Sequence, residues 1–412
     1  MVEIAGHIRP TPLSPRAALR FVIWFGVVSL FADMTYEGMR SISGPYLAFL
    51  GASGAAVGLI AGVGELLGYV LRLASGSVAD RSRLYWPITL MGYVVQMAVV
   101  PALALTGGWR TAAALIVLER IGKATRNPPR DVMLSQAGES IGHGWAFGLH
   151  EALDQSGAIM GPLFAAFILS NHGNYHAAFA WLLVPAAITV LLVSSVCVRY
   201  PAAGQLPSTQ LPARAERGAR LSAVFWLYAV GAGLVAFGFA DYALISYHYA
   251  ISKVMASSIV PVLYACAMGA GGLGSLLGGR SYDRFGLKVL LPATFFIAAY
   301  APLVFLGGFS LALIGTILWG VGIGVHETVM SAAIAQFVPA AQRARAYGKF
   351  TAIFGICWFA GSVVLGFLYD RSLTVTVWVA VLAQLLGIIP IAMTVAMLRE
   401  FNGSGPRGQS TA

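Results

Sequence analysis

Acidic side chains inside apolar stretches are the residues of this chain best suited to do chemistry. A charge at the centre of a bilayer costs about 2.5–3.5 kcal/mol, so such residues usually mark the pathway of an ion or substrate. A carboxylate in a medium of low dielectric constant also takes up a proton more readily than in water. The pattern predicts a transporter that moves protons or ions with its substrate. The acids concerned are Asp33, Glu37, Glu65, Glu119, Glu151, Asp154, Asp241 and Glu327.

Two short spacings place titratable residues on one face of a helix. Asp33 lies four residues before Glu37, and His150 lies four residues before Asp154. Residues at this spacing are neighbours on a helix surface, and histidine titrates near physiological pH. One alternative is that Glu37 only pairs with Arg40 at the outer rim, and another is that His150 only packs. The residues predicted to couple transport to protons are Asp33, Glu37, His150 and Asp154.

The elements that position these residues must be membrane helices. Of the 412 residues, 58% are hydrophobic and 10% are charged, whereas a soluble domain carries about 25% charged residues. The 48 glycines suit close packing of helices in lipid. The three cysteines have no paired spacing, which favours packing over a disulfide or a metal site. No metal-ligand spacing, nucleophile motif or ATP site is evident, so we expect neither an enzyme nor a cofactor.

Apolar segments of about 20 residues are long enough to span a bilayer. The sequence predicts twelve of them, and the N-terminus has no signal-peptide pattern. The predicted spans are 18–48, 55–79, 86–107, 110–127, 143–170, 176–198, 221–250, 257–278, 288–307, 309–335, 348–370 and 374–398.

The two halves of the chain repeat each other in order. Phe-Ala-Asp ends at both Asp33 and Asp241, and Gly-x3-Asp-Arg begins at both Gly76 and Gly279. Between the halves, residues 199–220 are rich in Pro, Ala and Arg without an apolar period, which is typical of a linker. The sequence predicts an all-α integral membrane protein of two pseudo-symmetric six-helix bundles. Its parts are a tail at 1–17, a bundle at 18–198, a linker at 199–220, a bundle at 221–398 and a tail at 399–412.

Positive charge is unevenly distributed between the two sets of loops. Most Arg and Lys residues follow the even-numbered segments, and the other loops hold only Arg110, Lys253 and Arg371. Cytoplasmic loops carry this excess, so we predict that both termini are cytoplasmic. The net charge of +10 is thereby explained without a nucleic-acid partner.

The repeated loop motif resembles that of the major facilitator superfamily, G-x-x-x-D-R/K-x-G-R/K-R/K. The second copy fits well, whereas the first has Arg83 where glycine is expected. In that family the loop is a latch that closes the cytoplasmic side. The residues assigned to it by resemblance are Gly76, Asp80, Arg81, Arg126, Arg130, Gly279, Asp283, Arg284 and Gly286.

The fifth segment resembles the antiporter signature of the same family, G-x8-G-x3-G-P-x2-G-G. Gly148, Gly157, Gly161 and Pro162 match at every spacing, and alanines replace the final pair. A helix with such a small-faced surface can pack closely and bend at its proline. We expect it to pack against its partner in the other half. Members with this signature mostly exchange substrate for protons.

The expected function is proton-coupled export of a small organic molecule by a monomer in the bacterial plasma membrane. Acidic residues in the second half suggest a polar or cationic substrate. An importer or uniporter of a polar metabolite is the alternative; a sensor or a membrane enzyme fits less well. By position and resemblance, the expected substrate cavity is formed by Tyr36, Glu65, Arg120, Asp241, Tyr247, His326 and Glu327.

Overall fold

The structure is a computed structural model that describes residues 14–204, 221–338 and 342–403. Residues 1–13 and 404–412 of the predicted tails, and residues 205–220 of the predicted linker, therefore lie outside the described residues. The first half contains α1 (Pro15–Phe49), α2 (Gly54–Ser82), α3 (Tyr85–Ala102), α4 (Trp109–Ile141), α5 (His143–His172), α6 (Tyr175–Trp181) and α7 (Leu183–Arg199). The second half contains α8 (Ala223–Phe237), α9 (Tyr242–Ser252), α10 (Ile259–Phe285), α11 (Leu290–Ile297), α12 (Tyr300–Leu306), α13 (Phe309–Phe337), α14 (Arg343–Tyr369) and α15 (Leu373–Gly403).

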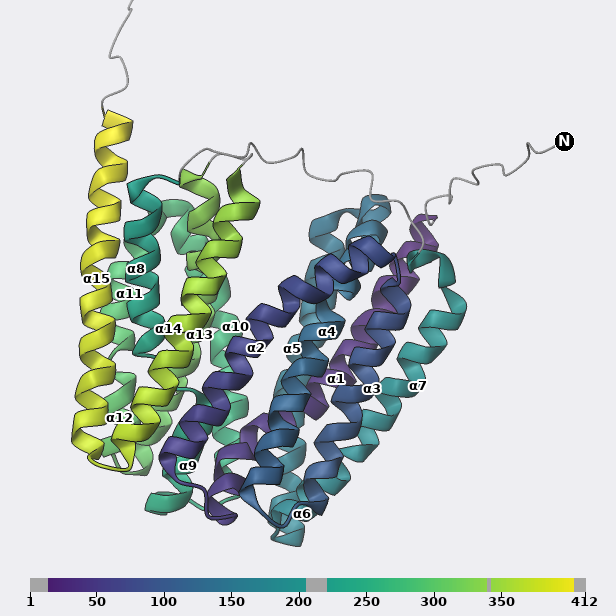
Figure 1. Cartoon of the computed structure of the whole chain (residues 1–412), viewed down its shortest axis with the longest axis horizontal. Coiled ribbons are helices and arrows are strands. Elements are labelled where there is room, and N and C mark those ends of the chain that lie inside the picture. The colour runs from purple at the N-terminus through teal and green to yellow at the C-terminus, as the bar shows by residue number, and fades with distance from the viewer. Residues whose placement is uncertain (1–13, 205–220, 339–341, 404–412) are drawn as a thin grey trace, which may run out of the picture.

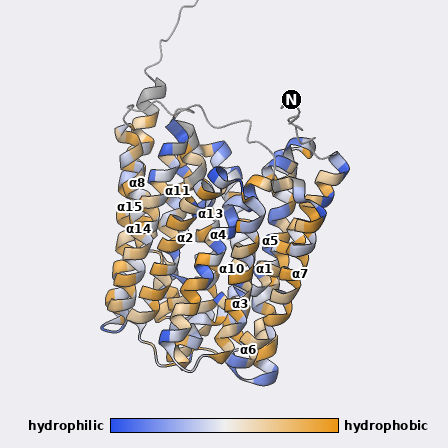
Figure 2. Ribbon diagram, turned by 45° about the vertical axis from the view of Figure 1, so that its right-hand side comes forward, coloured by the Kyte–Doolittle hydropathy of each residue, from blue (hydrophilic) through white to orange (hydrophobic). Residues whose placement is uncertain are grey.

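The described residues are helical, and ten stretches among them are long and apolar enough to cross a membrane. One of these stretches, Ile259–Leu306, is 48 residues long and covers most of two predicted spans, 257–278 and 288–307. The predicted span 110–127 lies in α4, which carries too many charges to be selected on hydropathy. The all-helical membrane fold is thus confirmed, and the count of twelve spans stays a prediction. Figure 2 shows hydrophobic residues along most of the helices and hydrophilic residues toward their ends.

The helices form two bundles that correspond to the halves of the chain (Figure 1). Between the bundles, α2 packs against α14, α1 against α9, and α5 against α10. We call the side on which α7 ends and α8 begins the linker side, and the other side the outer side. The contact of α2 with α14 lies toward the outer side, and the two helices diverge toward the linker side (Figure 1).

Helix α4 is longer than predicted because a neighbouring side chain compensates for a proline. The predicted span ends at residue 127, but α4 continues through Pro128 and Pro129 to Ile141. A proline has no N–H, so Pro128 leaves the carbonyl of Ala124 without its helical partner. The hydroxyl of Ser75 on α2 donates a hydrogen bond to this carbonyl over 3.0 Å. The helix therefore continues beyond the membrane-spanning part toward the linker side.

The predicted span 221–250 is broken in the middle into α8 and α9. Asp241 is the N-cap of α9, and its side chain accepts a hydrogen bond from the N–H of Ala243 over 2.9 Å. The indole of Trp319 donates to the carbonyl of Ala240 (2.9 Å), and the hydroxyl of Tyr300 donates to that of Gly238 (2.9 Å). Irregular backbone at membrane depth needs such partners. Asp241 therefore has a structural role that the Phe-Ala-Asp repeat did not predict.

Two of the three glycines of the antiporter signature pack closely within their own half, whereas Gly148 lines the space between the halves. A Cβ atom at Gly157 would overlap the carbonyl oxygen of Leu30, and one at Gly161 would overlap that of Met34. Both of these carbonyls belong to α1, so these two glycines serve packing inside the first half. The expected packing of this helix against a partner in the other half is present as well, between α5 and α10. The contact of α5 with the other half uses a different face, on which the side-chain amide of Gln155 donates to the carbonyl of Met268 over 2.8 Å.

Candidate functional site

A cavity of about 770 Å³ lies between the two bundles at mid-length of the helices. The first half supplies most of its charge from α1, α2, α4 and α5. The second half supplies Glu327, Trp319 and Trp358 and a glycine-rich stretch of α10. The charged residues of its lining are Asp33, Glu37, Arg40, Glu65, Arg72, Arg120, Lys123, Glu151, Asp154 and Glu327. A chamber of this size, with aromatic and charged walls, suits a small organic molecule.

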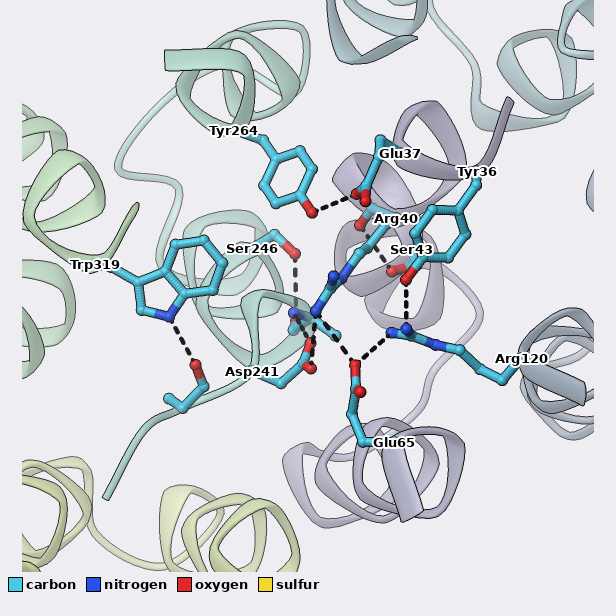
Figure 3. Close-up of polar contacts among 12 residues, drawn as sticks. Tyr36, Glu37, Arg40, Ser43, Glu65, Arg120, Asp241, Ser246, Tyr264 and Trp319 are labelled. Carbon is cyan, nitrogen blue, oxygen red and sulfur yellow. Dashed lines mark hydrogen bonds and ion pairs between the residues drawn. The ribbon is translucent and has the colours of Figure 1, made fainter. Parts of the chain in front are cut away.

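Arg40 is the centre of an ion-pair network that joins the two halves (Figure 3). Its Nη2 atom lies 3.4 Å from Oε1 of Glu65 and 3.4 Å from Oδ2 of Asp241. Nη2 of Arg120 lies 3.0 Å from the same oxygen of Glu65, and Arg120 also donates to the hydroxyl of Tyr36. Because α1 carries Arg40 and the second half carries Asp241, any separation of the halves here must break an ion pair.

The sequence left open the alternative that Glu37 only pairs with Arg40. In the structure Glu37 has a different partner. Its Oε2 atom accepts a hydrogen bond from the hydroxyl of Tyr264 over 2.6 Å. Tyr264 belongs to α10 in the other half. Glu37 and Arg40 on one helix therefore each hold a different part of the second half (Figure 3).

Arg126, which was assigned to the latch by resemblance, lies fully buried in the first bundle. Its Nη2 atom is 3.4 Å from Oδ1 of Asp33. Its Nε–H donates to Gln96 (2.6 Å) and its Nη1–H to the hydroxyl of Tyr93 (3.0 Å). The amide of Gln96 in turn donates to Glu119 over 2.6 Å. Asp33 thus has an ion-pair partner, which its own helix did not predict.

Asp154 has a different environment from Asp33. Both line the cavity and interact electrostatically with each other, Asp154 from α5 and Asp33 from α1. Oδ1 of Asp154 is buried and has no hydrogen-bond partner among the described residues. His150 is also buried, but it bonds to the hydroxyl of Ser29 over 2.8 Å and does not line the cavity. The His150–Asp154 spacing therefore does not place both groups at the same cavity.

Four of the predicted cavity residues line this space, namely Tyr36, Glu65, Arg120 and Glu327. The other three do not line it, although Asp241 pairs with the lining residue Arg40. Asp241 caps α9, and Tyr247 donates to the carbonyl of Ala52 over 3.0 Å on the outer side. His326 bonds to Thr294 over 3.1 Å and lines a small adjoining apolar pocket with Glu327 and Trp358.

Sequence reasoning placed Arg120 in the cavity but did not assign the other basic lining residues, Arg40, Arg72 and Lys123, to it. It had examined charges in apolar stretches chiefly for acids, and the same criterion applied to bases would have found Arg72 and Lys123. Lys123 lies over the ring of Tyr36, with its Nζ atom 3.5 Å from the ring centroid. The two cations balance part of the negative charge of the lining.

The loop-motif residues lie at the linker-side ends of α2 and α10. Asp80 is exposed and accepts a hydrogen bond from the hydroxyl of Tyr85 (3.1 Å), which belongs to its own half. Arg130 pairs with the adjacent Asp131 over 2.8 Å. These contacts all stay within one half. The role of these residues as a latch stays a prediction.

Comparison with known proteins identifies the family. A family model described as Major Facilitator Superfamily matches residues 17–348 and 241–411. An uncharacterized protein of Mycobacterium tuberculosis is 40% identical over 377 residues, which cover 90% of this chain and 92% of that protein. An uncharacterized MFS-type transporter of Methanocaldococcus jannaschii is 25% identical over 381 residues, covering 89% of this chain and 93% of that protein.

Solved structures share the fold at low sequence identity. A bacterial homolog of the human lysosomal transporter Spinster, inward-facing and unoccupied, has a TM-score of 0.68 at 14% identity, covering 92% of this chain and 95% of that one. The nucleoside transporter NupG has a TM-score of 0.70 at 15% identity, covering 92% and 99%. These likenesses concern the fold. The family model and the close relatives show that the chain belongs to the major facilitator superfamily and is a multi-pass membrane transporter.

Proposed function

We propose that the protein exports a small organic molecule in exchange for protons, by alternating access of the central cavity to the two sides of the bacterial plasma membrane. The observation that carries this proposal is the cavity between the halves, closed on the outer side by contacts between them and lined by Asp33 and Asp154. The antiporter signature in α5 supports exchange rather than simple import. The protein works as a monomer, since each chain contains a complete cavity.

The linker side is the cytoplasmic side in this proposal, because the excess of Arg and Lys lies on the loops there. The divergence of α2 from α14 then makes the described conformation inward-facing (Figure 1). A cytoplasmic substrate reaches the cavity from this side. The outer contacts must open before it can leave.

Coupling follows from the two carboxylates that share the cavity wall. Asp33 is compensated by Arg126, whereas within the described part of the chain no cation lies at ion-pair distance from Asp154. Two neighbouring negative charges repel each other, and uptake of one proton relieves this repulsion. A cationic or polar substrate in the same cavity would relieve it too. Proton and substrate would therefore compete, which is the requirement of an exchanger.

A flux assay in proteoliposomes tests the proposal. Purified protein would be reconstituted and offered a library of small organic cations and neutral polar molecules, with and without an imposed pH gradient. We expect at least one compound to accumulate against its concentration gradient only when the protons flow in the opposite direction. Accumulation with protons flowing in the same direction would instead establish import, and transport indifferent to pH would establish a uniporter.

The orientation can be checked by cysteine labelling in a cysteine-free background. Ser82 is exposed at the linker-side end of α2, and Gly107 is exposed at the outer end before α4. We expect Ser82→Cys in intact cells to react only with a membrane-permeant maleimide, and Gly107→Cys to react with an impermeant one as well. The reverse pattern would place the linker outside the cell.

A further inference from the structure

Asp370 joins the two halves at the outer side of the molecule. It follows the last residue of α14, and its carboxylate oxygens accept hydrogen bonds from the N–H groups of Gly54 (2.7 Å) and Ala55 (2.8 Å). These are the first two residues of α2. The first N–H groups of a helix have no partner within the helix, and the helix dipole favours an anion there. The other half of the protein thus supplies part of the cap of α2.

The first half supplies the rest of this cap. The hydroxyl of Ser53 accepts a hydrogen bond from the N–H of Ala56 over 3.2 Å. Ser53 precedes α2 and moves with it, whereas Asp370 moves with α14. The N-terminus of α2 is therefore fully capped only while the two halves meet on this side.

The two halves are in close contact around the hydrogen bonds of Asp370 with the start of α2. A Cβ atom at Gly58 would overlap the carbonyl oxygen of Ser362 on α14. The hydroxyl of Tyr247 donates to the carbonyl of Ala52, just before α2, over 3.0 Å. Asp370 lies at the exposed rim of this contact, where the halves must first separate if the outer side opens.

The same two helices separate toward their other end. On the linker side α2 diverges from α14 (Figure 1), and Asp80 near the end of α2 accepts a hydrogen bond from Tyr85 in its own half. The internal repeat offers no second copy of the Asp370 bond either. The spacing of Gly161 and Gly361 pairs Asp370 with Ser170, whose hydroxyl donates to Phe167 within its own helix over 2.9 Å.

We infer that Asp370 is a gating residue that holds the outer side closed while the cavity is open to the linker side. This inference rests on the proposed alternating access. Opening the outer side breaks both bonds and transfers two backbone N–H groups and a carboxylate to water. Without the carboxylate these two hydrogen bonds no longer stabilise the state with a closed outer side. The equilibrium then shifts toward the state with an open outer side.

Distances between spin labels across the two halves test the inference in the full-length protein. Labels at Gly107 and Gly308 report on the outer side, and labels at Ser82 and Lys288 report on the linker side. We expect Asp370→Ala to change the ratio of outward-open to outward-closed molecules about tenfold, as loss of a helix cap would. The long-distance population should grow for the outer pair and shrink for the linker-side pair. Asp370→Glu, which keeps the anion, should largely restore the original distances.

Two control variants separate gating from stability. Arg371→Ala removes the neighbouring charge, which stacks on Phe367 and not on α2, and should leave both distances unchanged. Ser53→Ala removes the cap supplied by the same half and should lower the melting temperature without moving the distances. If Asp370→Ala leaves the distances unchanged while pH or substrate still moves them, the gating role is wrong and alternating access stands. If nothing moves them in any variant or condition, alternating access itself is wrong, and the inference with it.

Discussion

Asp154→Asn is expected to reduce transport driven by a pH gradient to the background of empty liposomes. The amide mimics the protonated carboxyl group permanently, so the cavity wall can no longer release a proton to the other side. Exchange of labelled for unlabelled substrate without a gradient should persist, because no net proton movement is required. Binding of substrate should also lose its dependence on pH. The measurements are uptake under an imposed gradient, exchange at equal pH, and equilibrium binding between pH 5 and 9.

Asp33→Asn distinguishes the two carboxylates. Asp33 is held at 3.4 Å from the buried Arg126, so its replacement leaves a cation without its partner and should reduce stability as well as transport. If Asp33 carries the proton instead, gradient-driven transport should survive Asp154→Asn and be lost in Asp33→Asn. Glu139→Gln is the matched control, since Glu139 is an exposed acid of α4 outside the cavity lining. Gradient-driven transport that survives both Asp substitutions would exclude both acids and leave Glu37, Glu65 or Glu327.

The sequence predicted the membrane fold and the importance of the buried acids, because both depend on local composition. An acid in an apolar segment is costly wherever its helix packs, so Asp33, Glu65, Asp154 and Glu327 could be selected without knowing their neighbours. Each of these four does line the cavity. What they bind there stays a prediction.

Partners could not be predicted, because they come from distant parts of the chain. Asp33 has no cation one helical turn away on its own helix. Its partner Arg126 is 93 residues further along the chain. The family motif could not predict packing partners either. A motif gives the spacing of residues along one helix and does not determine which neighbouring helix each face contacts. Gly157 and Gly161 of α5 illustrate this, since they pack against α1, whereas Gly148 of the same motif lines the cavity.

The second large effect concerns the stability of the first bundle. Arg126→Met should lower the free energy of unfolding by about 3–5 kcal/mol, because removing one member of a buried ion pair leaves an uncompensated charge. Here the loss extends beyond Asp33, since Gln96 and Tyr93 each lose a hydrogen-bond donor. The measurement is thermal unfolding of the purified protein in detergent, followed by size-exclusion chromatography of the heated sample.

Arg130→Met is the matched control for this substitution. Arg130 lies one turn further along α4, and its side chain is 12% exposed while that of its partner Asp131 is 49% exposed. An ion pair in contact with water contributes only about 0–1 kcal/mol, so this variant should melt close to the original protein. The double variant Arg126→Met, Asp33→Asn should regain part of the lost stability, because it leaves no unpaired charge at that position. Equal melting temperatures for Arg126→Met and Arg130→Met would show that the buried network contributes no more than the partly exposed Arg130–Asp131 pair.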